Sequence, residues 1–490
     1  MKLKSKKIWS AVAVASMTFP CVALATNGMN LEGYGPIALG MGGASYAYDN
    51  GTAAVMNNPA TLALAPEGHR LDLALGFLGP DVRAKYPGAP DATSSSNAFW
   101  MPAIGWMQKK NQFAFGAGVF AQGGMGTEYS GDSFMAAGSG ETVRSEVSVG
   151  RFIVPLTYDI NPMISIGASL DFVWAGMDIK MAMSGAQFGD MVADFGGSQA
   201  AGTASGTMVQ GLLANIGPGN LLEPPSTTGG PINWARFDFS NNNKFTGEAF
   251  GTGFGGKIGA VFKVNPQLTV GLTYHSKTAL SDLETDNATV SMSANVDTGL
   301  ASGNPATNTY TPQTIAVKGK IKVLDFQWPA TYGIGMAYKP NSKFMLAADI
   351  KRIAWADVMK SFKLHFTADS SQEGLAAGFV NSDLDATLFQ DWKDQTVVAL
   401  GGAYQITNLV VLRAGFNHAA NPIPSQYLNA LFPAIVVNHV TVGFGYKINN
   451  ASTVDFAYSR AAKASDTNPG NNVTSEMSQN NFQVMYSYRY

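Results

Sequence analysis

Few residues of this chain are spaced for chemistry on a small molecule. The histidines are His69, His275, His365, His418 and His439. They are scattered and lack the spacing of metal ligands. No Gly-x-Ser-x-Gly turn precedes a helix, and no glycine-rich phosphate loop lies between a strand and a helix. The sequence therefore predicts that the protein is not an enzyme and has neither a metal site nor a cofactor.

The first 25 residues have the pattern of a secretory signal peptide. Four lysines precede an apolar run from Ile8 to Val22, and Ala23-Leu24-Ala25 forms a small-residue cleavage site. The only cysteine, Cys21, lies in this segment, and Phe19-Pro20 before it disfavours a lipoprotein signal. Removal of the signal peptide leaves 28 basic and 34 acidic residues, a net charge of −6. We therefore expect an exported chain without disulfides and without a nucleic-acid partner.

The composition suits a membrane protein without membrane-spanning helices. Charged residues make up 13% of the chain, against roughly 25% in soluble domains, and there are 54 glycines, 28 phenylalanines and 17 tyrosines. No uninterrupted apolar run of 18 residues follows Ala25. An exported chain of this kind enters a membrane as a closed β-barrel, which places it in the outer membrane of a Gram-negative cell.

Period-2 alternation predicts fourteen antiparallel strands and therefore an all-β barrel of fourteen strands. The predicted strands are 69–78, 97–108, 111–121, 142–158, 164–182, 245–263, 267–278, 313–338, 343–360, 394–405, 409–418, 437–447, 452–460 and 481–490. In one of the clearest, Val440, Val442, Phe444 and Tyr446 alternate with small or polar residues. One face suits lipid and the other suits an interior.

The connections between these strands alternate between tight turns and long loops. Turn residues such as Asn161-Pro162 and Asn449-Asn450 join one set of strand ends, and the longest connection, 183–244, belongs to the other set. This asymmetry is typical of periplasmic turns and extracellular loops. The C-terminal strand, with alternating aromatics up to Tyr490, resembles a recognition signal for the barrel-assembly machinery. The candidate anchors at the membrane interfaces are Trp100, Trp106, Trp174, Trp328 and Trp355.

Residues 26–66 precede the first strand and are rich in small residues. A barrel of fourteen strands leaves a lumen that would pass water unless something filled it. The apolar residues Leu31, Tyr34, Leu39 and Tyr46 argue against a disordered leader. We therefore expect three parts: a signal peptide (1–25), a hatch inside the lumen (26–66) and the barrel (67–490).

This hatch segment resembles that of the FadL-type outer-membrane transporters of long-chain fatty acids and other hydrophobic compounds. The resemblance rests on Gly40-Met-Gly42-Gly43-Ala44, Asp49-Asn50 and Asn58-Pro59-Ala60, and it continues in Trp328–Trp355 and Arg413–Tyr446. It implies a monomeric barrel in which ligand binds an extracellular groove, moves to an interior pocket and leaves sideways beside a kinked third strand. In the third strand here, Gly116, Gly118, Gly123 and Gly124 are candidates for that lateral opening, or they face the hatch.

The long loops supply candidates for a ligand groove. Met208, Leu212, Leu213 and Ile216 recur at helical spacing in the 183–244 loop, and Leu428 and Phe432 lie in the 419–436 loop. These residues either pack on neighbouring loops or form an apolar groove, and both are compatible. Methionine-containing surfaces suit ligands of varied shape.

Three cations are candidates for holding a ligand carboxylate: Arg151, Lys180 and Lys360. The family resemblance implies an arginine on the fifth strand for this role, whereas the matching stretch here has only Lys180, beside Asp178. Fatty acids and neutral aromatic or alkane substrates therefore both stay open.

The sequence predicts passive uptake of hydrophobic molecules across the outer membrane, in contact with membrane lipid and lipopolysaccharide. The main alternative is a water-filled general porin for small polar solutes. A surface adhesin and an outer-membrane hydrolase are further alternatives.

Overall fold

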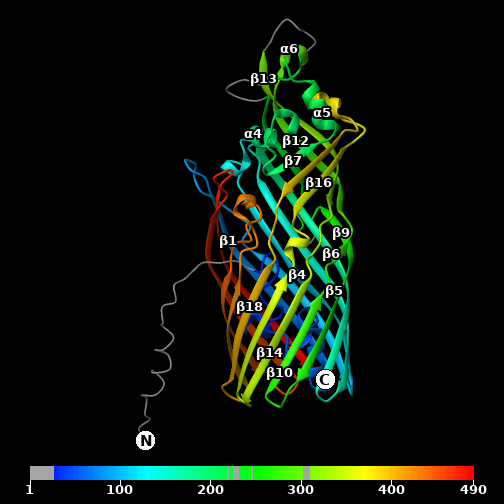
Figure 1. The fold of residues 1–490 in the computed structure, drawn as a ribbon, viewed down its shortest axis with the longest axis vertical. Coiled ribbons are helices and arrows are strands. Elements are labelled where there is room, and N and C mark those ends of the chain that lie inside the picture. The colour runs from blue at the N-terminus through cyan, green and yellow to red at the C-terminus, as the bar shows by residue number, and fades with distance from the viewer. Residues whose placement is uncertain (1–26, 218–219, 225–230, 242, 244–246, 302–308) are drawn as a thin grey trace.

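The computed structural model describes residues 27–217, 220–224, 231–241, 243, 247–301 and 309–490. The expected signal peptide lies outside the described residues. The chain forms one antiparallel sheet that closes on itself as a tall barrel, and part of that sheet rises above one rim (Figure 1).

The wall of the barrel is built from long strands that pair in chain order. They are β1 (Gly68–Lys85), β3 (Phe99–Lys110), β4 (Phe113–Tyr129), β5 (Val143–Asn161), β6 (Ile164–Ser184), β9 (Ala249–Lys263), β10 (Leu268–His275), β14 (Thr331–Asn341), β15 (Phe344–Ile353), β18 (Gln395–Gln405), β19 (Val410–Ala419), β20 (Asn438–Lys447), β21 (Ser452–Thr467) and β22 (Thr474–Arg489). Each pairs with the next, and β22 pairs with β1 to close the wall.

The predicted count of fourteen strands is corrected by β8 (Ile232–Phe239) and β12 (Leu283–Asp297). The lower part of β6 pairs with β9, whereas its upper part pairs with β8; β8 pairs with β12, which in turn meets β9. In the described part of the chain, the closed circuit through these two strands therefore has sixteen strands. The sequence assigned both strands to loops because their outer residues are polar, as in Thr289, Ser291 and Asn295, and do not face lipid.

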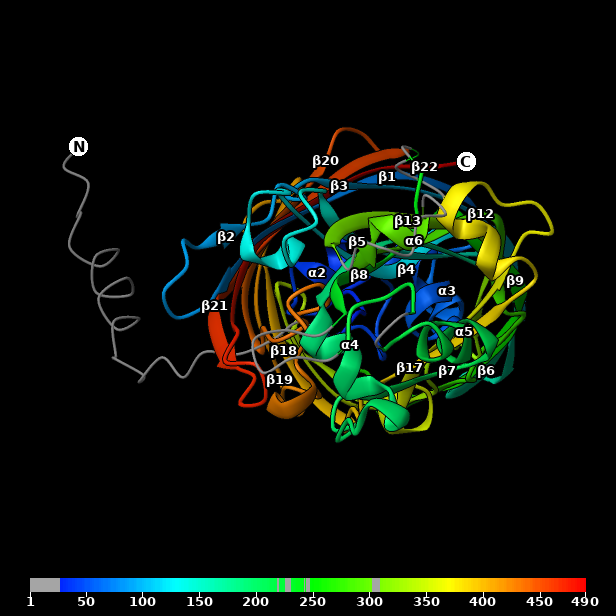
Figure 2. The same ribbon diagram turned by 90° about the horizontal axis from the view of Figure 1, so that it is seen from above.

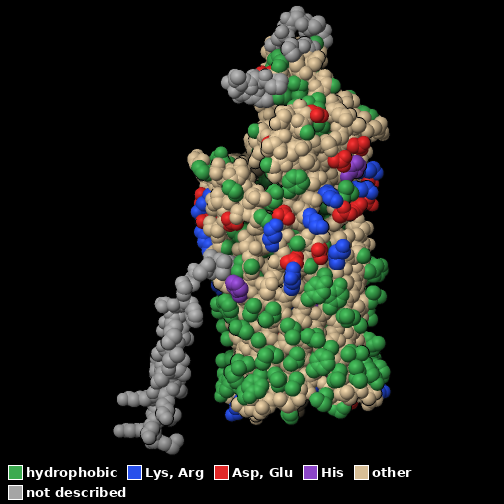
Figure 3. Space-filling model, in the orientation of Figure 1, with side chains coloured by type: hydrophobic (Ala, Val, Ile, Leu, Met, Phe, Trp, Pro, Cys, Tyr) green, Lys and Arg blue, Asp and Glu red, His purple; other side chains and the backbone are tan. Residues whose placement is uncertain are grey.

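The alternation of apolar and small residues follows the two faces of the wall. In β20, Val440 is 60% and Val442 50% exposed, whereas the alternate residues His439 and Thr441 are buried. Figure 3 shows the result as a broad hydrophobic band across the visible face of the lower barrel, with charged side chains gathered above it. Such a band matches the apolar girdle of a membrane β-barrel.

Above this band the long connections form a smaller sheet and several short helices. Here β8 and β12 are joined by β13 (Tyr310–Leu324), β16 (Ser361–Ala368), β17 (Asp383–Phe389) and β7 (Gly202–Ser205). The other short strands are β2 (Ala92–Thr93) and β11 (Ala279–Leu280). The prediction of one strand over 313–338 is wrong, because the chain leaves β13 at Leu324 and re-enters the wall at Thr331 after Trp328-Pro329.

All helices of the described residues are short. They are α2 (Pro36–Leu39), α3 (Ala54–Asn57), α4 (Gly185–Met191), α5 (Thr207–Ala214) and α6 (Thr298–Ala301), with 3-10 turns at Gly51–Ala53, Pro59–Leu64, Phe134–Ala136, Ala193–Phe195, Trp355–Asp357, Gly374–Phe379 and Ser425–Tyr427. None of the helices that the structure describes has the length and apolarity needed to cross a bilayer.

The N-terminal segment, residues 27–66, lies inside the ring of strands. Seen from above, α2 and α3 lie within the barrel outline (Figure 2). Most of its side chains are buried, including Leu39, Met41 and Met56 at 0–1% exposure. Asp349 of β15 accepts hydrogen bonds from the backbone N–H groups of Ser45 (2.6 Å) and Tyr46 (3.1 Å). Inward-facing wall residues therefore satisfy backbone groups that would otherwise need water.

Candidate functional site: a pocket beside a gap in the barrel wall

The wall has a gap between β3 and β4. Among the described residues, these strands pair only from Ile104↔Val119 down to Lys110↔Phe113, while Phe99–Ala103 of β3 continue to pair with β1 alone. Pro102 has no N–H to give to a neighbouring strand, which favours an unpaired edge. Above the gap, the chain closes again where the Ser95 N–H donates to the Glu128 carbonyl (2.8 Å). The gap is therefore a window bounded above and below.

A bulge in β4 borders this window, and the N-terminal segment holds it. The register of β4 against β5 shifts between Ala121 and Gly123. The amide of Gln122 donates to Asn30 Oδ1 (2.8 Å) and contacts the Tyr34 hydroxyl, which donates to the Gln122 carbonyl (2.6 Å). Burial raises the pKa of Tyr34 well above its ordinary value, so its hydroxyl stays a donor.

Glycines allow the N-terminal segment and the neighbouring strands to approach β4. A Cβ on Gly123 would lie 2.1 Å from the Met29 carbonyl oxygen, and the Gly124 N–H donates to that same oxygen (3.1 Å). Both glycines line the pocket described next. Gly116 and Gly118 lie below, where β3 and β4 still pair, and Gly116 faces the Trp106 carbonyl. Of the four candidates for a lateral opening, two thus border the window.

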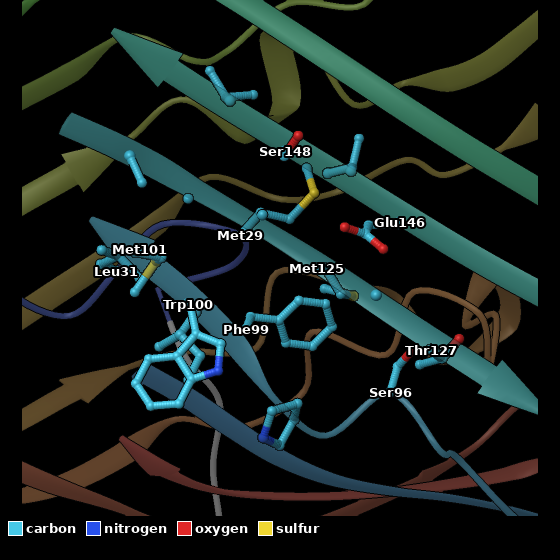
Figure 4. Close-up of a pocket in the computed structure, with 18 of the residues that line it drawn as sticks. Met29, Leu31, Ser96, Phe99, Trp100, Met101, Met125, Thr127, Glu146 and Ser148 are labelled. Atoms are coloured by element: carbon cyan, nitrogen blue, oxygen red, sulfur yellow. The ribbon is translucent and has the colours of Figure 1, made fainter. Parts of the chain in front are cut away.

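A cavity of about 840 Å³ opens behind the window (Figure 4). Its apolar walls include Met29, Leu31, Phe99, Trp100, Met101, Phe120, Met125, Val147, Val149, Trp174 and Met477. Trp100 both lines the cavity and is 49% exposed on the outside of the barrel. The 419–436 loop closes the top, because the Tyr129 and Thr127 hydroxyls donate to the carbonyls of Ala430 (2.8 Å) and Leu431 (3.1 Å). An apolar cavity of this size suits a small hydrophobic ligand.

The charged groups of the cavity are mostly acidic. Glu32, Glu128 and Glu146 line it together with one cation, Arg144. The Arg144 guanidinium lies 2.5 Å from Glu146, 3.9 Å from Glu128 and 3.5 Å from Asp178 behind them. Its positive charge is thus already matched by carboxylates of the protein.

The predicted hatch residues make close contacts with the wall. Asn58 donates to the Tyr46 carbonyl (2.8 Å) and caps the turn by accepting from the Ala60 N–H, while the Pro59 carbonyl accepts from Thr157 (2.9 Å). Gly42 exchanges hydrogen bonds with Thr441 and Asn417. Gly43 has φ +86°, and a Cβ there would lie 2.0 Å from the Glu32 carbonyl oxygen. These residues therefore shape the segment against the wall and do not line the cavity.

The three candidate carboxylate-binding cations are separated in space. Arg151 is buried and lies 2.8 Å from Asp171, which Lys257 also contacts. Lys180 is the register partner of Arg144 but does not line the cavity. The prediction that Lys360 is a strand cation is corrected, because it is exposed in the turn before β16, where its carbonyl accepts from Gln390 and Asp391.

The groove candidates also lie away from the cavity. Met208 and Leu212 of α5 are 1% exposed and pack on β8, β12 and β17. Leu213 and Ile216 are partly buried beside them. Leu428 is buried in the 419–436 loop and Phe432 packs against Phe362, whereas the next residue, Pro433, does line the cavity.

Sequence reasoning missed most of the cavity residues. The proposed interface anchors Trp100 and Trp174 line it, while Trp328 and Trp355 are 0–1% exposed and pack edge to face inside the barrel, so their anchor role is wrong. Pro102 inside a predicted strand was the available signal for the window. Within the described residues no group of three or more histidine or acidic side chains is placed to bind a metal.

A closed barrel with a lipid-type outer surface and an apolar interior pocket defines a membrane β-barrel with an internal binding site. The chain matches the family "Outer membrane protein transport protein (OMPP1/FadL/TodX)" over residues 12–489. It belongs to this family, and it is a β-barrel of the Gram-negative outer membrane. The family is one of transport proteins, in agreement with the prediction that the chain is not an enzyme.

Solved structures with the same fold include two toluene transporters. TodX from Pseudomonas putida is 28% identical, with 94% of this chain and 99% of that chain covered and a TM-score of 0.77. TbuX from Ralstonia pickettii is also 28% identical, with the same coverage and a TM-score of 0.72. A protein of Chlorobium limicola described as "Uncharacterized protein in phosphoenolpyruvate carboxykinase gene 5'region" is 44% identical over 92 residues, which are 19% of this chain and 45% of that protein.

Proposed function

We propose that this protein takes up hydrophobic molecules passively across the outer membrane and releases them sideways through the β3–β4 window. The single observation that carries the proposal is the apolar cavity of about 840 Å³ placed directly behind an unpaired stretch of the wall. Family membership and the two toluene transporters with the same fold support it.

Ligand would reach the cavity from the extracellular loops. Each buried CH₂ gains about 0.8 kcal/mol on leaving water, so a hydrophobic molecule enters an apolar pocket without an energy source. Pro433 of the 419–436 loop lines the cavity, so ligand would enter beside this loop. The apolar packing around α5 would serve as a scaffold for this loop region.

Release would occur between β3 and β4. Trp100 borders both the cavity and the outer surface, so a bound molecule has a short route to the bilayer. The unpaired edges of the two strands require no backbone hydrogen bonds to be broken. Residues 26–66 would act as a hatch, because the buried segment inside the ring hinders direct flow of water and ions. This role argues against the general-porin alternative.

The proposal is tested by uptake. Cells that lack an endogenous transporter of this kind are compared with and without this chain for accumulation of labelled toluene, oleate and hexadecane, with a hydrophilic sugar as control. We expect faster accumulation of at least one hydrophobic compound and no change for the sugar. If cells with and without the chain accumulated each hydrophobic compound at the same rate, or if the chain sped entry of the sugar, the proposal would be contradicted.

A further inference from the structure

We propose that the cavity selects hydrophobic molecules whose polar end is a protonated amine, in preference to the carboxylates of fatty acids. This inference rests on the proposed function and names the substrate class of the same cavity. It follows from the charges that line the cavity, from the state of its one arginine and from its aromatic walls.

Glu32 is the first of these observations. The residue lines the cavity and is only 2% exposed. In the described part of the chain the carboxylate accepts one hydrogen bond, from the Asn481 amide (3.2 Å), and no cationic group lies within 4.0 Å of it. The Lys351 ammonium attracts this carboxylate from beyond 4.0 Å, without an ion-pair contact. A buried carboxylate without a contacting counter-ion is costly unless a cation joins it. The cavity thus contains a buried negative charge that a ligand cation could neutralise.

Arg144 offers no free positive charge to a ligand carboxylate. It contacts Glu146, Asp178 and Glu128 at 2.5, 3.5 and 3.9 Å. Among the described residues that line the cavity, three glutamates therefore face a single arginine. An incoming carboxylate would have to displace one of these protein carboxylates from Arg144. The remaining carboxylates would repel it, and this repulsion is strong in a cavity of low dielectric.

Of the other interior cations, Lys351 attracts both Asp349 and Glu32 but does not line the cavity. Arg151 and Lys257 share Asp171, and neither lines the cavity. Lys180 stands beside Arg144 across the β5–β6 register, so it adds one positive charge behind the wall. Asp178 and Asp238 also lie there, and Asp238 is paired with Arg236 at 3.4 Å. The side of the cavity near Arg144 consequently stays acidic.

The cavity walls suit a cation with an apolar body. Phe99, Trp100, Phe120 and Trp174 contribute aromatic rings, and Glu146 points into the same space (Figure 4). Aromatic faces attract ammonium groups, and Met29 and Met125 adapt to varied apolar shapes. An aryl- or alkylammonium ion would satisfy both the carboxylates and the rings.

The experiment compares three ligands of one shape: 2-phenylethylammonium, 2-phenylethanol and phenylacetate. Their affinities for the purified full chain in detergent are measured by calorimetry at pH 7. We expect the ammonium ion to bind at least about tenfold more tightly than the alcohol, and phenylacetate at least about tenfold more weakly. Equal affinities of the ammonium ion and phenylacetate would overturn the inference. Binding of none of the three would instead count against the proposed function.

Variants then assign the preference to the cavity. Glu32→Gln keeps the shape of the side chain and the oxygen that accepts from Asn481, so we expect the fold to be retained. Glu146→Gln is the second variant. Each should lower the ammonium-to-phenylacetate affinity ratio by at least about fivefold and leave 2-phenylethanol unchanged. Glu373→Gln, on the exposed 3-10 turn far along the chain, is the matched control. A ratio that stays the same in both cavity variants would contradict the inference.

Discussion

At the scale of residues, Gly123 sets how closely the N-terminal segment approaches the window. A methyl group at this position would lie 2.1 Å from the Met29 carbonyl oxygen, which is a steric clash. We expect Gly123→Ala to push residues 28–30 away from β4 and to speed hydrogen exchange of the Gly124 N–H, which donates to Met29. Gly189→Ala, where nothing lies within 4 Å of the added atom, is the control. Identical exchange at Gly124 in both variants would refute this role.

Gln122 supplies the complementary contact from the wall. Its side-chain amide donates to Asn30, and Gln122→Leu would leave buried polar groups of Asn30 and Tyr34 without this partner. Asn30 keeps the Trp328 indole as a donor, and the Tyr34 hydroxyl keeps the Gln122 carbonyl as an acceptor. The change therefore removes two hydrogen bonds of about 0.5–1.5 kcal/mol each, and the urea midpoint of unfolding in detergent should fall. Gln112→Leu, on the exposed turn between β3 and β4, should leave the midpoint unchanged. An unshifted midpoint for Gln122→Leu would show that the network is not stabilising.

The sequence predicted which face of the wall most strand side chains lie on, but it did not predict which residues from different strands contact one another. Alternation places Val440 outward and Thr441 inward, as observed. Glu32, Phe99 and Glu146 line one cavity although they come from the N-terminal segment, β3 and β5, and no local pattern records such long-range proximity or the missing β3–β4 pairing. The alternation within strands therefore could not predict which residues line the cavity.

At the scale of elements, the wall strands were predictable because a lipid-facing strand needs an apolar outer row. The strands β8 and β12 were not, since they rise above the membrane and expose polar residues. The helical spacing of Met208 and Leu212 did indicate a real helix, α5, but its apolar face is used for packing. Spacing predicts a helix and a buried face, and it does not tell what covers that face.

This packing role of α5 gives a further prediction. Leu212→Ala removes a side chain that is 1% exposed between α5 and the sheet above the barrel, which typically costs 2–5 kcal/mol. We expect faster cleavage of the 183–244 region by a protease added outside the cell. Leu213→Ala, at a partly buried position on the same helix, should have the smaller effect. Equal cleavage of both variants would argue that α5 is not anchored by Leu212.

At the scale of the whole molecule, the N-terminal segment and the wall act as one packed unit. Asp349 binds two backbone N–H groups of the segment, so Asp349→Ala should loosen it. We expect more frequent and larger ion-conducting openings in planar bilayers than for the unchanged protein. Asp286→Ala, at a residue exposed above the barrel, is the control. A conductance as low as that of the control would contradict a blocking role of the segment.

The central claim is that hydrophobic molecules leave through the β3–β4 window, and closing the window tests it most directly. Continuing the register from Ile104↔Val119 places Pro102 opposite Ala121, and both line the cavity. Pro102→Cys/Ala121→Cys can be linked by a short bis-maleimide, since the only natural cysteine, Cys21, lies in the expected signal peptide. Ile104→Cys/Val119→Cys, a pair already joined in the wall, is the control.

Toluene uptake is then measured in cells before and after the reagent is added. We predict that cross-linking lowers toluene uptake at least about tenfold for the pair that spans the window. Uptake should stay unchanged for the same pair without the reagent and for the control pair with it. Undiminished uptake through a fully cross-linked window would contradict the account.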